Sequence, residues 1–152
     1  SHWEENGLSS IAIRYFNVYG PRQDERMVVP RFINQAMNNE PIVIYGKGKQ
    51  TRDFTYVTDA VRITVDLAKT LQDGFEIYNI CGDNELTISQ VAESVKQTLK
   101  SKSKIQNIDM PNDRVEFEVE RRTGNSNKLT EAIGRQEFIK FKNGLENIIS
   151  GK

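Results

Sequence analysis

Hydrophobic positions along the chain follow two periodicities, and the changes between them mark the expected elements. Residues 10–18 form an almost continuous run of β-branched and aromatic side chains, which predicts a strand buried on both faces, as in a parallel sheet. Shorter apolar runs at 42–45 and 75–80 predict two further strands. Residues 50–57 predict another strand, and the glycine-rich turn at 46–49 could join it to 42–45 as a hairpin.

Helical spacing of apolar residues appears between these runs, together with helix-start signals. Pro30 suits the first position of a helix. Thr58 and Asp59 are residue types that cap a helix start, and residues 87–90 have the form of a capping box. The three apolar stripes are Phe32, Ile33, Ala36 and Met37; Ala60, Ile63, Thr64, Leu67, Ala68 and Leu71; and Ile88, Val91, Ala92, Val95 and Leu99.

The last third of the chain continues the mixture of elements. Residues 100–104 predict a charged connector, and alternation of apolar residues with glutamate over 115–119 predicts a half-exposed strand. Two short helices are expected near 127–133 and 144–150. Strands and helices therefore interleave, which indicates an α/β fold.

Charge and length narrow the classes of function. The chain has 152 residues, and its 21 basic and 21 acidic side chains cancel. That length suits one domain with its own core. Zero net charge argues against a nucleic-acid partner, which needs a basic face. No apolar run reaches the ~18 residues of a membrane span, and the polar, acidic first ten residues do not resemble a signal peptide.

Cysteine and histidine are too few for several kinds of chemistry. Cys81 is the single cysteine and ends an apolar run, so we expect a buried, inert thiol and a reducing, cytoplasmic setting. His2 is the single histidine. Because structural zinc needs about four cysteine or histidine ligands, we expect no metal site.

Two short segments match known catalytic or phosphate-binding motifs only in part, and we do not assign those functions to them. Tyr45 and Lys49 have the Tyr-x-x-x-Lys spacing of a dehydrogenase catalytic pair, but that pair works on a helix, and Gly46 and Gly48 favour a turn here. The same glycines lack phosphate-loop spacing. No G-x-x-G-x-x-G follows a strand, so no dinucleotide loop is encoded.

Arginines beside aromatic and amide residues form the informative pattern. Arg14 and Arg22 flank the end of the first strand, Arg52 follows the glycine turn, and Arg122 precedes a polar stretch. Planar guanidinium groups match the oxygens of a diphosphate, and Tyr45 offers a face on which a base can stack. The alternative is that these arginines pair with surface carboxylates.

Three motifs in a fixed order resemble one known family. They are Arg14-Tyr15-Phe16-Asn17-Val18-Tyr19-Gly20-Pro21-Arg22, then residues 28–33 (VVPRFI), then residues 44–59 (IYGKGKQTRDFTYVTD). Residues 78–80, 86–88 and 121–128 complete the series. The chain resembles the carboxy-terminal, substrate-binding half of the extended short-chain dehydrogenases. These are NAD-dependent sugar-nucleotide epimerases, dehydratases and decarboxylases, and the UDP-glucose 4-epimerase type is nearest.

The resemblance implies a role for individual side chains. Tyr15 and Phe16 match positions on the nicotinamide side of the pocket, and Asn17 matches the asparagine that bonds the substrate near its diphosphate. The other implied substrate-binding positions are Val29 and Pro30 at the base, Tyr45 at the uracil ring, Arg52 and Arg122 at the diphosphate, and Asn125 at a ribose or sugar hydroxyl. Many relatives carry aspartate where this chain has Asn125, so a hydrogen-bond acceptor remains but a charge does not. Arg22 is expected near the pocket mouth.

The same resemblance implies a division of the fold and of the chemistry. The expected architecture is the last strand or strands of a Rossmann-type parallel sheet, over residues 1–27, plus a small mixed α/β nucleotide-sugar subdomain with returning segments, over 28–152. NAD would be bound mainly by an amino-terminal half absent here, which would also carry the catalytic groups, so no catalytic residue is expected in this chain. The expected partner is a nucleotide-sugar, with UDP-sugars favoured, and a homodimer is expected only for the complete enzyme.

Other interpretations remain open at this point. The reaction of the complete enzyme could be 4,6-dehydration or decarboxylation of a nucleotide-sugar rather than 4-epimerisation. The chain could also be an inactive, truncated paralogue that acts as a binding module. An RNA-binding domain that stacks bases on Tyr15, Phe16 and Tyr45 is disfavoured by zero net charge. A parallel sheet without its other strands would leave apolar edges uncovered, so we expect marginal stability.

Overall fold

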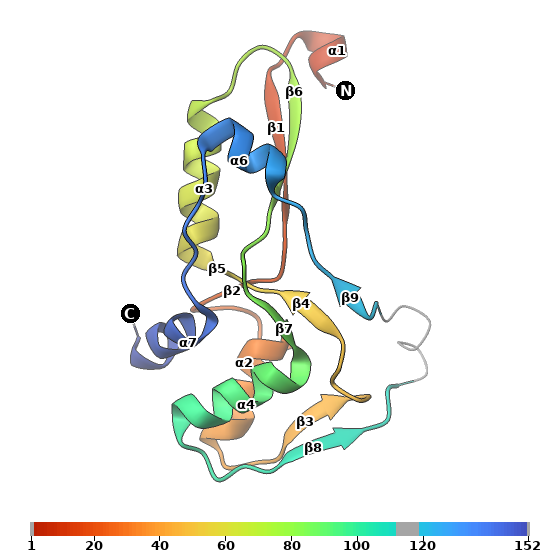
Figure 1. Cartoon of the computed structure of the whole chain (residues 1–152), viewed down its shortest axis with the longest axis vertical. Helices are drawn as coiled ribbons and strands as arrows, with labels where there is room; N and C mark the ends of the chain where they lie inside the picture. The colour runs from red at the N-terminus through yellow and green to blue at the C-terminus, as the bar shows by residue number, and fades with distance from the viewer. Residues whose placement is uncertain (1, 112–118, 152) are drawn as a thin grey trace.

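The fold is an elongated arrangement of short sheets and helices with two apolar cores (Figure 1). The computed structural model describes residues 2–111 and 119–151. The elements in chain order are α1 (His2–Asn6), β1 (Ser10–Tyr15), β2 (Val18–Tyr19), α2 (Val28–Met37), β3 (Ile42–Tyr45), β4 (Thr51–Asp53), β5 (Thr55–Tyr56), α3 (Val57–Lys69), β6 (Phe75–Ile80), β7 (Glu85–Thr87), α4 (Ile88–Leu99), β8 (Ile105–Ile108), β9 (Arg121–Arg122), α6 (Asn127–Ile133) and α7 (Phe141–Ser150).

One end of the molecule is a parallel strand pair covered on one face by helices. β1 and β6 pair in register from Ser10 with Phe75 to Tyr15 with Ile80. Side chains of α3, β6 and α6 form a core behind this pair: Ile63, Leu67, Tyr78, Ile80 and Leu129. The parallel pairing and the interleaved helices confirm the expected α/β fold class.

The first strand is shorter and less buried than its apolar run predicts. β1 ends at Tyr15, and the chain turns at Asn17 before β2 begins. The first four residues of β1 are half-buried and its last two are exposed. Only one strand pairs with β1 among the described residues, so the run is not buried on both faces as expected.

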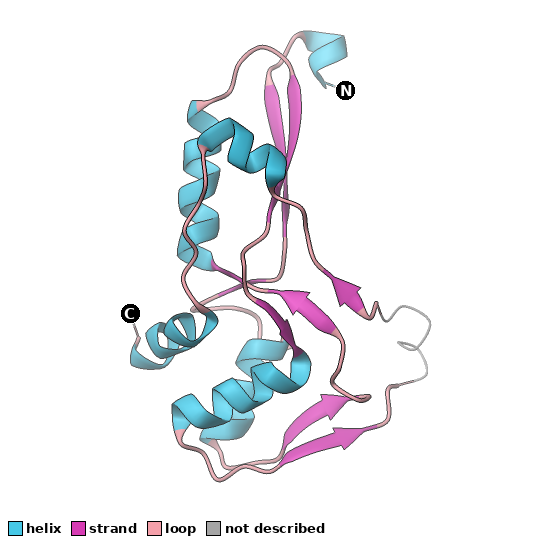
Figure 2. Cartoon of the chain, viewed as in Figure 1, coloured by secondary structure: helices cyan, strands magenta, loops and turns pink. Residues whose placement is uncertain are grey.

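The larger core is formed by buried side chains of α2, β3, α4 and α7, together with Tyr19 of β2 and Tyr56 of β5. Figure 2 shows how helices and strands alternate along the backbone. The capping box expected at the start of α4 is confirmed. The Thr87 hydroxyl accepts a bond from Gln90 N at 3.1 Å, and Thr87 N donates to Gln90 Oε1 at 2.8 Å. The turn at 46–49 is also confirmed, with positive φ at Gly46 and Gly48.

The expected hairpin between 42–45 and 50–57 is wrong. β3 pairs in parallel with β8. β4 instead lies between β7 and β9, and β5 pairs with β2. The physical reason is that the turn is tied to the start of α4: Ser89 N donates to Gly48 O at 3.0 Å, and Ile88 N donates to Gln50 O at 3.1 Å. These bonds direct the chain away from β3.

Helix starts differ from the sequence-based expectations in three places. Pro30 occupies the third position of α2, not the first. α3 begins at Val57 and its N-cap residue is Tyr56, which makes no side-chain cap bond, so the predicted caps Thr58 and Asp59 lie inside the helix. The buried Asp59 carboxylate accepts a bond from Ile139 N at 2.8 Å. α7 begins at Phe141, earlier than expected.

Three further points concern the edges of these elements. Met37, expected in the apolar stripe of α2, is 65% exposed at the helix end. The strand expected over 115–119 lies almost entirely outside the described residues. None of the described helices has the length and hydrophobicity that crossing a bilayer requires.

Candidate functional site

A small pocket opens near the middle of the molecule, where α2, the end of β3 and β4 meet the turn between β1 and β2. Its cavity volume is about 220 Å³, below the range of about 300 to 1,000 Å³ that encloses a whole small ligand. The lining residues are Asn17, Arg26, Met27, Val28, Arg31, Tyr45, Gln50, Arg52, Phe54, Ile88 and Met110. Three positions predicted from the sequence, Asn17, Tyr45 and Arg52, therefore lie around one cavity.

The side chain of Asn17 connects the β1–β2 turn to β4. Its backbone has a φ of 35°, a region that asparagine enters more readily than most residues. Its side-chain Nδ2 donates to the carbonyl oxygen of Asp53 at 2.8 Å, which holds the β1–β2 turn against β4. Because a primary amide has two N–H donors, one N–H remains for a ligand acceptor such as a phosphate oxygen.

Arg52 and Arg122 lie beside each other on two parallel strands. They are Cα partners in the pairing of β4 with β9, so their side chains emerge on the same face of the sheet. Arg52 Nη1 donates to the carbonyls of Thr51 at 2.9 Å and Val119 at 2.7 Å. No carboxylate among the described residues forms an ion pair with Arg122.

The neighbouring Arg121 has a different environment. Its guanidinium forms two hydrogen bonds with the Glu85 carboxylate, at 2.8 and 2.9 Å. These bonds, together with one from the Thr51 hydroxyl at 2.8 Å, lower the pKa of Glu85 to about 2. The charge of Arg121 is therefore locally balanced by Glu85, whereas Arg122 has no such carboxylate partner among the described residues.

The aromatic ring of Tyr45 lines the other side of the pocket. The Arg31 guanidinium lies over the Tyr45 ring, 4.9 Å from its centroid, a cation–π arrangement. Arg31 also lies 5.4 Å from the Phe32 ring centroid. Tyr45 is thus held in place at the carboxyl end of β3, half-buried, with its ring at the pocket.

The start of α2 supplies backbone and aliphatic surface. Val28 lines the pocket, while Val29 is 2% exposed and belongs to the core behind it. Pro30 is half-buried in the same helical turn. Arg26 also lines the pocket, and its guanidinium is bonded to Asp24 at 2.6 to 3.1 Å, which lowers the pKa of that carboxyl.

Arg122 and the remaining predicted positions are not among the residues that line this pocket. Tyr15 lines a separate groove against α3. Phe16 packs near Gly124, where a Cβ atom would come within 3.0 Å of its ring. Asn125 is exposed; its Oδ1 accepts a bond from Asn127 N at 2.8 Å, at the start of α6. Arg22 is exposed, with a φ of 65°.

Sequence reasoning did not select Arg26, Arg31, Gln50 and Met110 as pocket residues. A signal for Arg31 existed, because Val28 and Arg31 are three residues apart on one helix and share a face. Gln50 and Met110 had no comparable signal, since their place depends on the pairing of β3 with β8.

A buried carboxyl, that of Asp53, follows Arg52 on β4. Asp53 is 4% exposed. Burial, reinforced by the nearby charges of Glu85 and Asp83, raises its pKa to about 6. Cys81 is 2% exposed, as expected, and burial raises the pKa of its thiol.

The expected turn between Tyr45 and Lys49 keeps this pair off any helix, so they do not form a dehydrogenase-type catalytic pair. In the parts of the chain that the structure describes, no three His, Cys, Asp or Glu side chains gather as metal ligands would.

Residues 1–81 match the model of the NAD dependent epimerase/dehydratase family. Over 150 residues the chain is 37% identical to UDP-N-acetyl-alpha-D-glucosaminuronate decarboxylase of Bacillus cytotoxicus, covering 94% of the chain and 46% of that protein. Over 153 residues it is 34% identical to human dTDP-D-glucose 4,6-dehydratase, covering 98% of the chain and 43% of that protein.

Solved structures agree with these relatives. The crystal structure of UDP-glucose 4-epimerase from Thermotoga maritima with UDP-glucose superimposes with a TM-score of 0.86 at 28% identity, covering 97% of this chain and 47% of that one. UDP-glucuronic acid 4-epimerase from Bacillus cereus, in complex with UDP-glucuronic acid and NAD, gives 0.85 at 27%, covering 99% and 48%. The chain thus spans less than half the length of each of these four relatives.

Proposed function

Because the chain belongs to the NAD-dependent epimerase/dehydratase family, we propose that it forms the nucleotide-sugar-binding part of a sugar-nucleotide-modifying enzyme. Its task is to hold the nucleotide diphosphate of the substrate. The chemical step belongs to groups outside these 152 residues. The UDP-sugar 4-epimerase type is the proposed reaction class.

The registered pair Arg52 and Arg122 is the observation that supports this proposal most directly. A diphosphate held between two guanidinium groups from neighbouring strands would accept charge-assisted hydrogen bonds from both. The second N–H of Asn17 would reach the same anion from the β1–β2 turn. Tyr45 would stack against the base at the far end of the pocket.

Sugar orientation is the proposed contribution of this chain to the rate. Fixing the diphosphate at two points limits where the sugar ring can lie relative to the reacting groups. Such positioning lowers the entropic part of an activation barrier. Val29 and Pro30 would border the base through their backbone, and Asn125 is the proposed contact for a ribose or sugar hydroxyl.

The family depends on NAD, which accepts and returns a hydride when it is bound. We propose that the NAD pyrophosphate is held mainly by groups outside residues 1–152. The groove beside Tyr15 has no charged lining residue, and Tyr15 Oη is bonded to Thr64 Oγ1 at 2.9 Å. We therefore propose only that Tyr15 and Phe16 border the nicotinamide, and that residues 1–27 end a Rossmann-type domain supplied mainly from elsewhere.

Relatives of this chain include a decarboxylase and a dehydratase as well as epimerases, so the reaction is best assigned by assay. The complete reading frame that contains residues 1–152 would be expressed and incubated with UDP-glucose, UDP-glucuronate and dTDP-glucose. We expect 4-epimerised UDP-sugar. Carbon dioxide release or a 4-keto-6-deoxy product would move the assignment to the decarboxylases or the dehydratases.

Binding by the 152-residue chain itself tests the proposal more directly. Calorimetric titrations would compare UDP-glucose, pyrophosphate and NAD. We expect UDP-glucose to bind with a Kd on the order of 0.1 to 1 mM, pyrophosphate more weakly, and NAD with no measurable heat. Tight NAD binding, or equal affinity for UDP-glucose and inorganic phosphate, would contradict the proposal.

A further inference from the structure

Gly124 is packed so closely against two side chains that it has no room for a Cβ atom. A Cβ on Gly124 would lie 2.7 Å from Cys81 Sγ, 2.9 Å from Cys81 Cβ and 3.0 Å from Phe16 Cε2, whereas nonbonded carbon atoms normally approach to about 3.5 to 4.0 Å. The φ angle of Gly124 lies outside the left-handed region that favours glycine. Space, and not backbone conformation, therefore requires glycine at this position.

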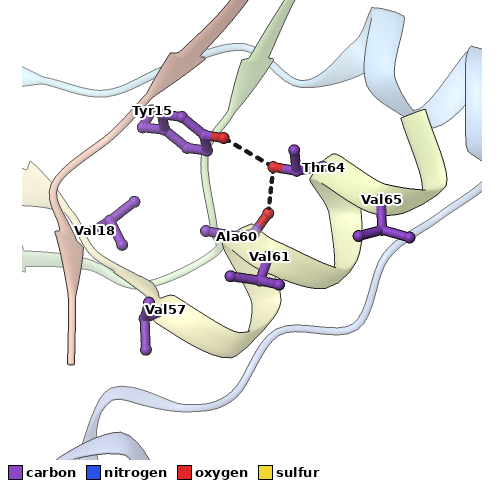
Figure 3. A pocket seen from close by; sticks show the side chains of 7 residues that line it. All are labelled: Tyr15, Val18, Val57, Ala60, Val61, Thr64 and Val65. Carbon is purple, nitrogen blue, oxygen red and sulfur yellow. Dashed lines mark hydrogen bonds between the residues drawn. The ribbon is translucent and has the colours of Figure 1, made fainter. Parts of the chain in front are cut away.

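The two side chains that contact Gly124 come from the ends of the β1–β6 strand pair. Phe16 directly follows β1 and Cys81 directly follows β6. Figure 3 shows Tyr15 pointing towards α3, with its hydroxyl bonded to Thr64. Because successive side chains of an extended strand point to opposite faces, Phe16 points to the other face, where Gly124 lies. Cys81 is 2% exposed, so its side chain has little room to turn aside.

Residues 122–125, which we call the linking segment, are held at both ends. At the start of the segment, Arg122 is the Cα partner of Arg52 on β4. At its end, Asn79 Nδ2 on β6 donates to the carbonyl of Asn125 at 3.2 Å. Figure 1 shows the segment leading from β9 to α6. The glycine lies between the two held points, so it cannot move outwards without displacing one of them.

The start of the linking segment is held more weakly than its end. α6 follows the segment and inserts Leu129, 1% exposed, into the core behind β6. β9 has only two residues, and both are exposed. The ion pair that joins Arg121 to Glu85 lies at the surface, where such pairs contribute little to stability. A displacement of the segment therefore reaches Arg122 rather than α6.

We propose that Gly124 is a positioning residue for nucleotide-diphosphate binding, because its close contact with Cys81 sets the position of Arg122 beside Arg52. A Cβ on Gly124 would have to move outwards by about 1 Å to reach a normal contact distance. Hydrogen bonds from a guanidinium to a phosphate oxygen weaken steeply with such changes in distance and angle. This inference rests on the proposed function for the identity of the ligand, whereas the packing at Gly124 can be tested without ligand.

Calorimetric titration of the 152-residue chain with UDP tests the positioning role. Gly124→Ala should weaken UDP binding by about fivefold to tenfold, part of the loss expected when the Arg122 contact is removed. In the Arg122→Gln background the same substitution should cause less than about a twofold further loss, because two changes that act through one group are not additive. Titrations are made at a temperature at which circular dichroism shows each variant to be folded.

A matched control and a compensating variant separate local crowding from a general loss of stability. Gly144→Ala also adds a methyl group at a close contact, against Tyr19 on the far side of the larger core, and should leave UDP affinity within about twofold. The double variant Gly124→Ala/Cys81→Gly removes the Sγ and Cβ atoms that the new methyl group would meet. It should restore UDP affinity to within about threefold of the unsubstituted chain.

The thiol of Cys81 provides a readout that needs no ligand. Cys81 is the single cysteine of the chain, and burial raises the pKa of its thiol, so alkylation by iodoacetamide depends on local opening around it. We expect Gly124→Ala to increase the alkylation rate roughly tenfold or more and Gly144→Ala to leave it within about twofold. Saturating UDP should slow alkylation of the unsubstituted chain, because a ligand bound by Arg122 holds the linking segment in place.

Two results would overturn the inference. One is an alkylation rate that is the same in Gly124→Ala and in the unsubstituted chain. The other is a loss of UDP affinity in Gly124→Ala that is equally large in the Arg122→Gln background, since Gly124 would then support the fold and not Arg122. If Gly124→Ala speeds alkylation but the unsubstituted chain does not bind UDP, the packing at Gly124 is supported and the proposed ligand is wrong. Failure of the inference and failure of the proposed function are therefore distinguishable.

Discussion

Arg52 of β4 and Arg122 of β9 are direct Cα partners across a pair of parallel strands. The two strands are held together by further contacts: Thr51 N donates to Glu120 O at 2.7 Å, and Arg52 Nη1 donates to Val119 O at 2.7 Å. A diphosphate between the two guanidinium groups would accept charge-assisted hydrogen bonds from both strands.

Arg52→Gln and Arg122→Gln should each weaken UDP binding by about tenfold to a hundredfold, the loss expected for one hydrogen bond to a charged group. Arg121→Gln is the matched control, because the Arg121 charge is already balanced by Glu85. Calorimetry with UDP in low salt measures all three. A loss at Arg121 equal to the loss at Arg122 would show that general positive charge, not the registered pair, attracts the ligand.

Tyr45→Ala should weaken UDP binding by roughly tenfold, since stacking of a base on an aromatic ring contributes about 1 to 3 kcal/mol. Pyrophosphate affinity should stay within twofold, because pyrophosphate has no base. Tyr45→Phe keeps the ring and should bind UDP almost as the unsubstituted chain does. If Tyr45→Ala weakens pyrophosphate binding as much as UDP binding, Tyr45 supports the fold of the pocket rather than the base.

Asp53 should make the protein less stable as the pH rises from about 4 to 6. Its pKa is about 6 in the folded chain and 3.8 without burial. The folded state therefore holds the proton more tightly, and the stabilisation present below pH 4 is lost as the pH rises through 6. Asp53→Asn should remove this slope and raise the free energy of unfolding at pH 7.5 by about 2 kcal/mol.

Urea unfolding at pH 4.5 and 7.5 measures the effect, and Asp109→Asn, at an exposed position, is the control. Glu85 acts in a different range, because its lowered pKa of about 2 removes stability only as the pH falls below its ordinary value of 4.5. A pH slope between 4.5 and 7.5 that is unchanged in Asp53→Asn would contradict the assignment.

Gly144→Ala should destabilise the protein by about 1 to 3 kcal/mol. Gly144 lies on α7 directly against the Tyr19 ring, and an added Cβ would come within 2.8 Å of Tyr19 Cζ. Tyr19 is 1% exposed and packs edge-to-face against Phe54 and Tyr56, so its ring has little room to move. Thermal unfolding measures the loss, and Asn143→Ala, exposed on the same helix, should be neutral or slightly stabilising.

Elements with local signals were predictable from the sequence. The capping box at Thr87 and Gln90, the apolar run of β3 and the two glycines of the following turn each determine their structure within a few residues. β8 was not predicted, because Ile105–Ile108 contains two polar residues between its two isoleucines and forms a strand only through its pairing with β3. The pairings of β4 with β7 and β9 likewise depend on contacts remote in sequence.

The candidate site was predictable in part, and for the same reason. Asn17 was selected from the first motif and Tyr45 and Arg52 from the third, and the structure places them around one cavity. Arg31 was not selected, because its place at the pocket depends on its contact with the Tyr45 ring, whose centroid lies 4.9 Å from the guanidinium. That contact forms only when α2 packs against β3. Asn125 and Tyr15 were selected with the others, yet the structure places neither in that cavity, and their roles remain predictions.

Arg122 lies on a strand of only two residues, so ligand binding includes the free energy of holding β9 against β4. Any separation of β9 from β4 moves the two guanidinium groups apart. Only the fraction of molecules in which the strands are paired can therefore bind an anion with both groups. The apparent Kd is then the intrinsic Kd divided by that fraction. A bound nucleotide would in turn stabilise the pairing of β9 with β4, so ligand binding and tertiary structure would stabilise each other.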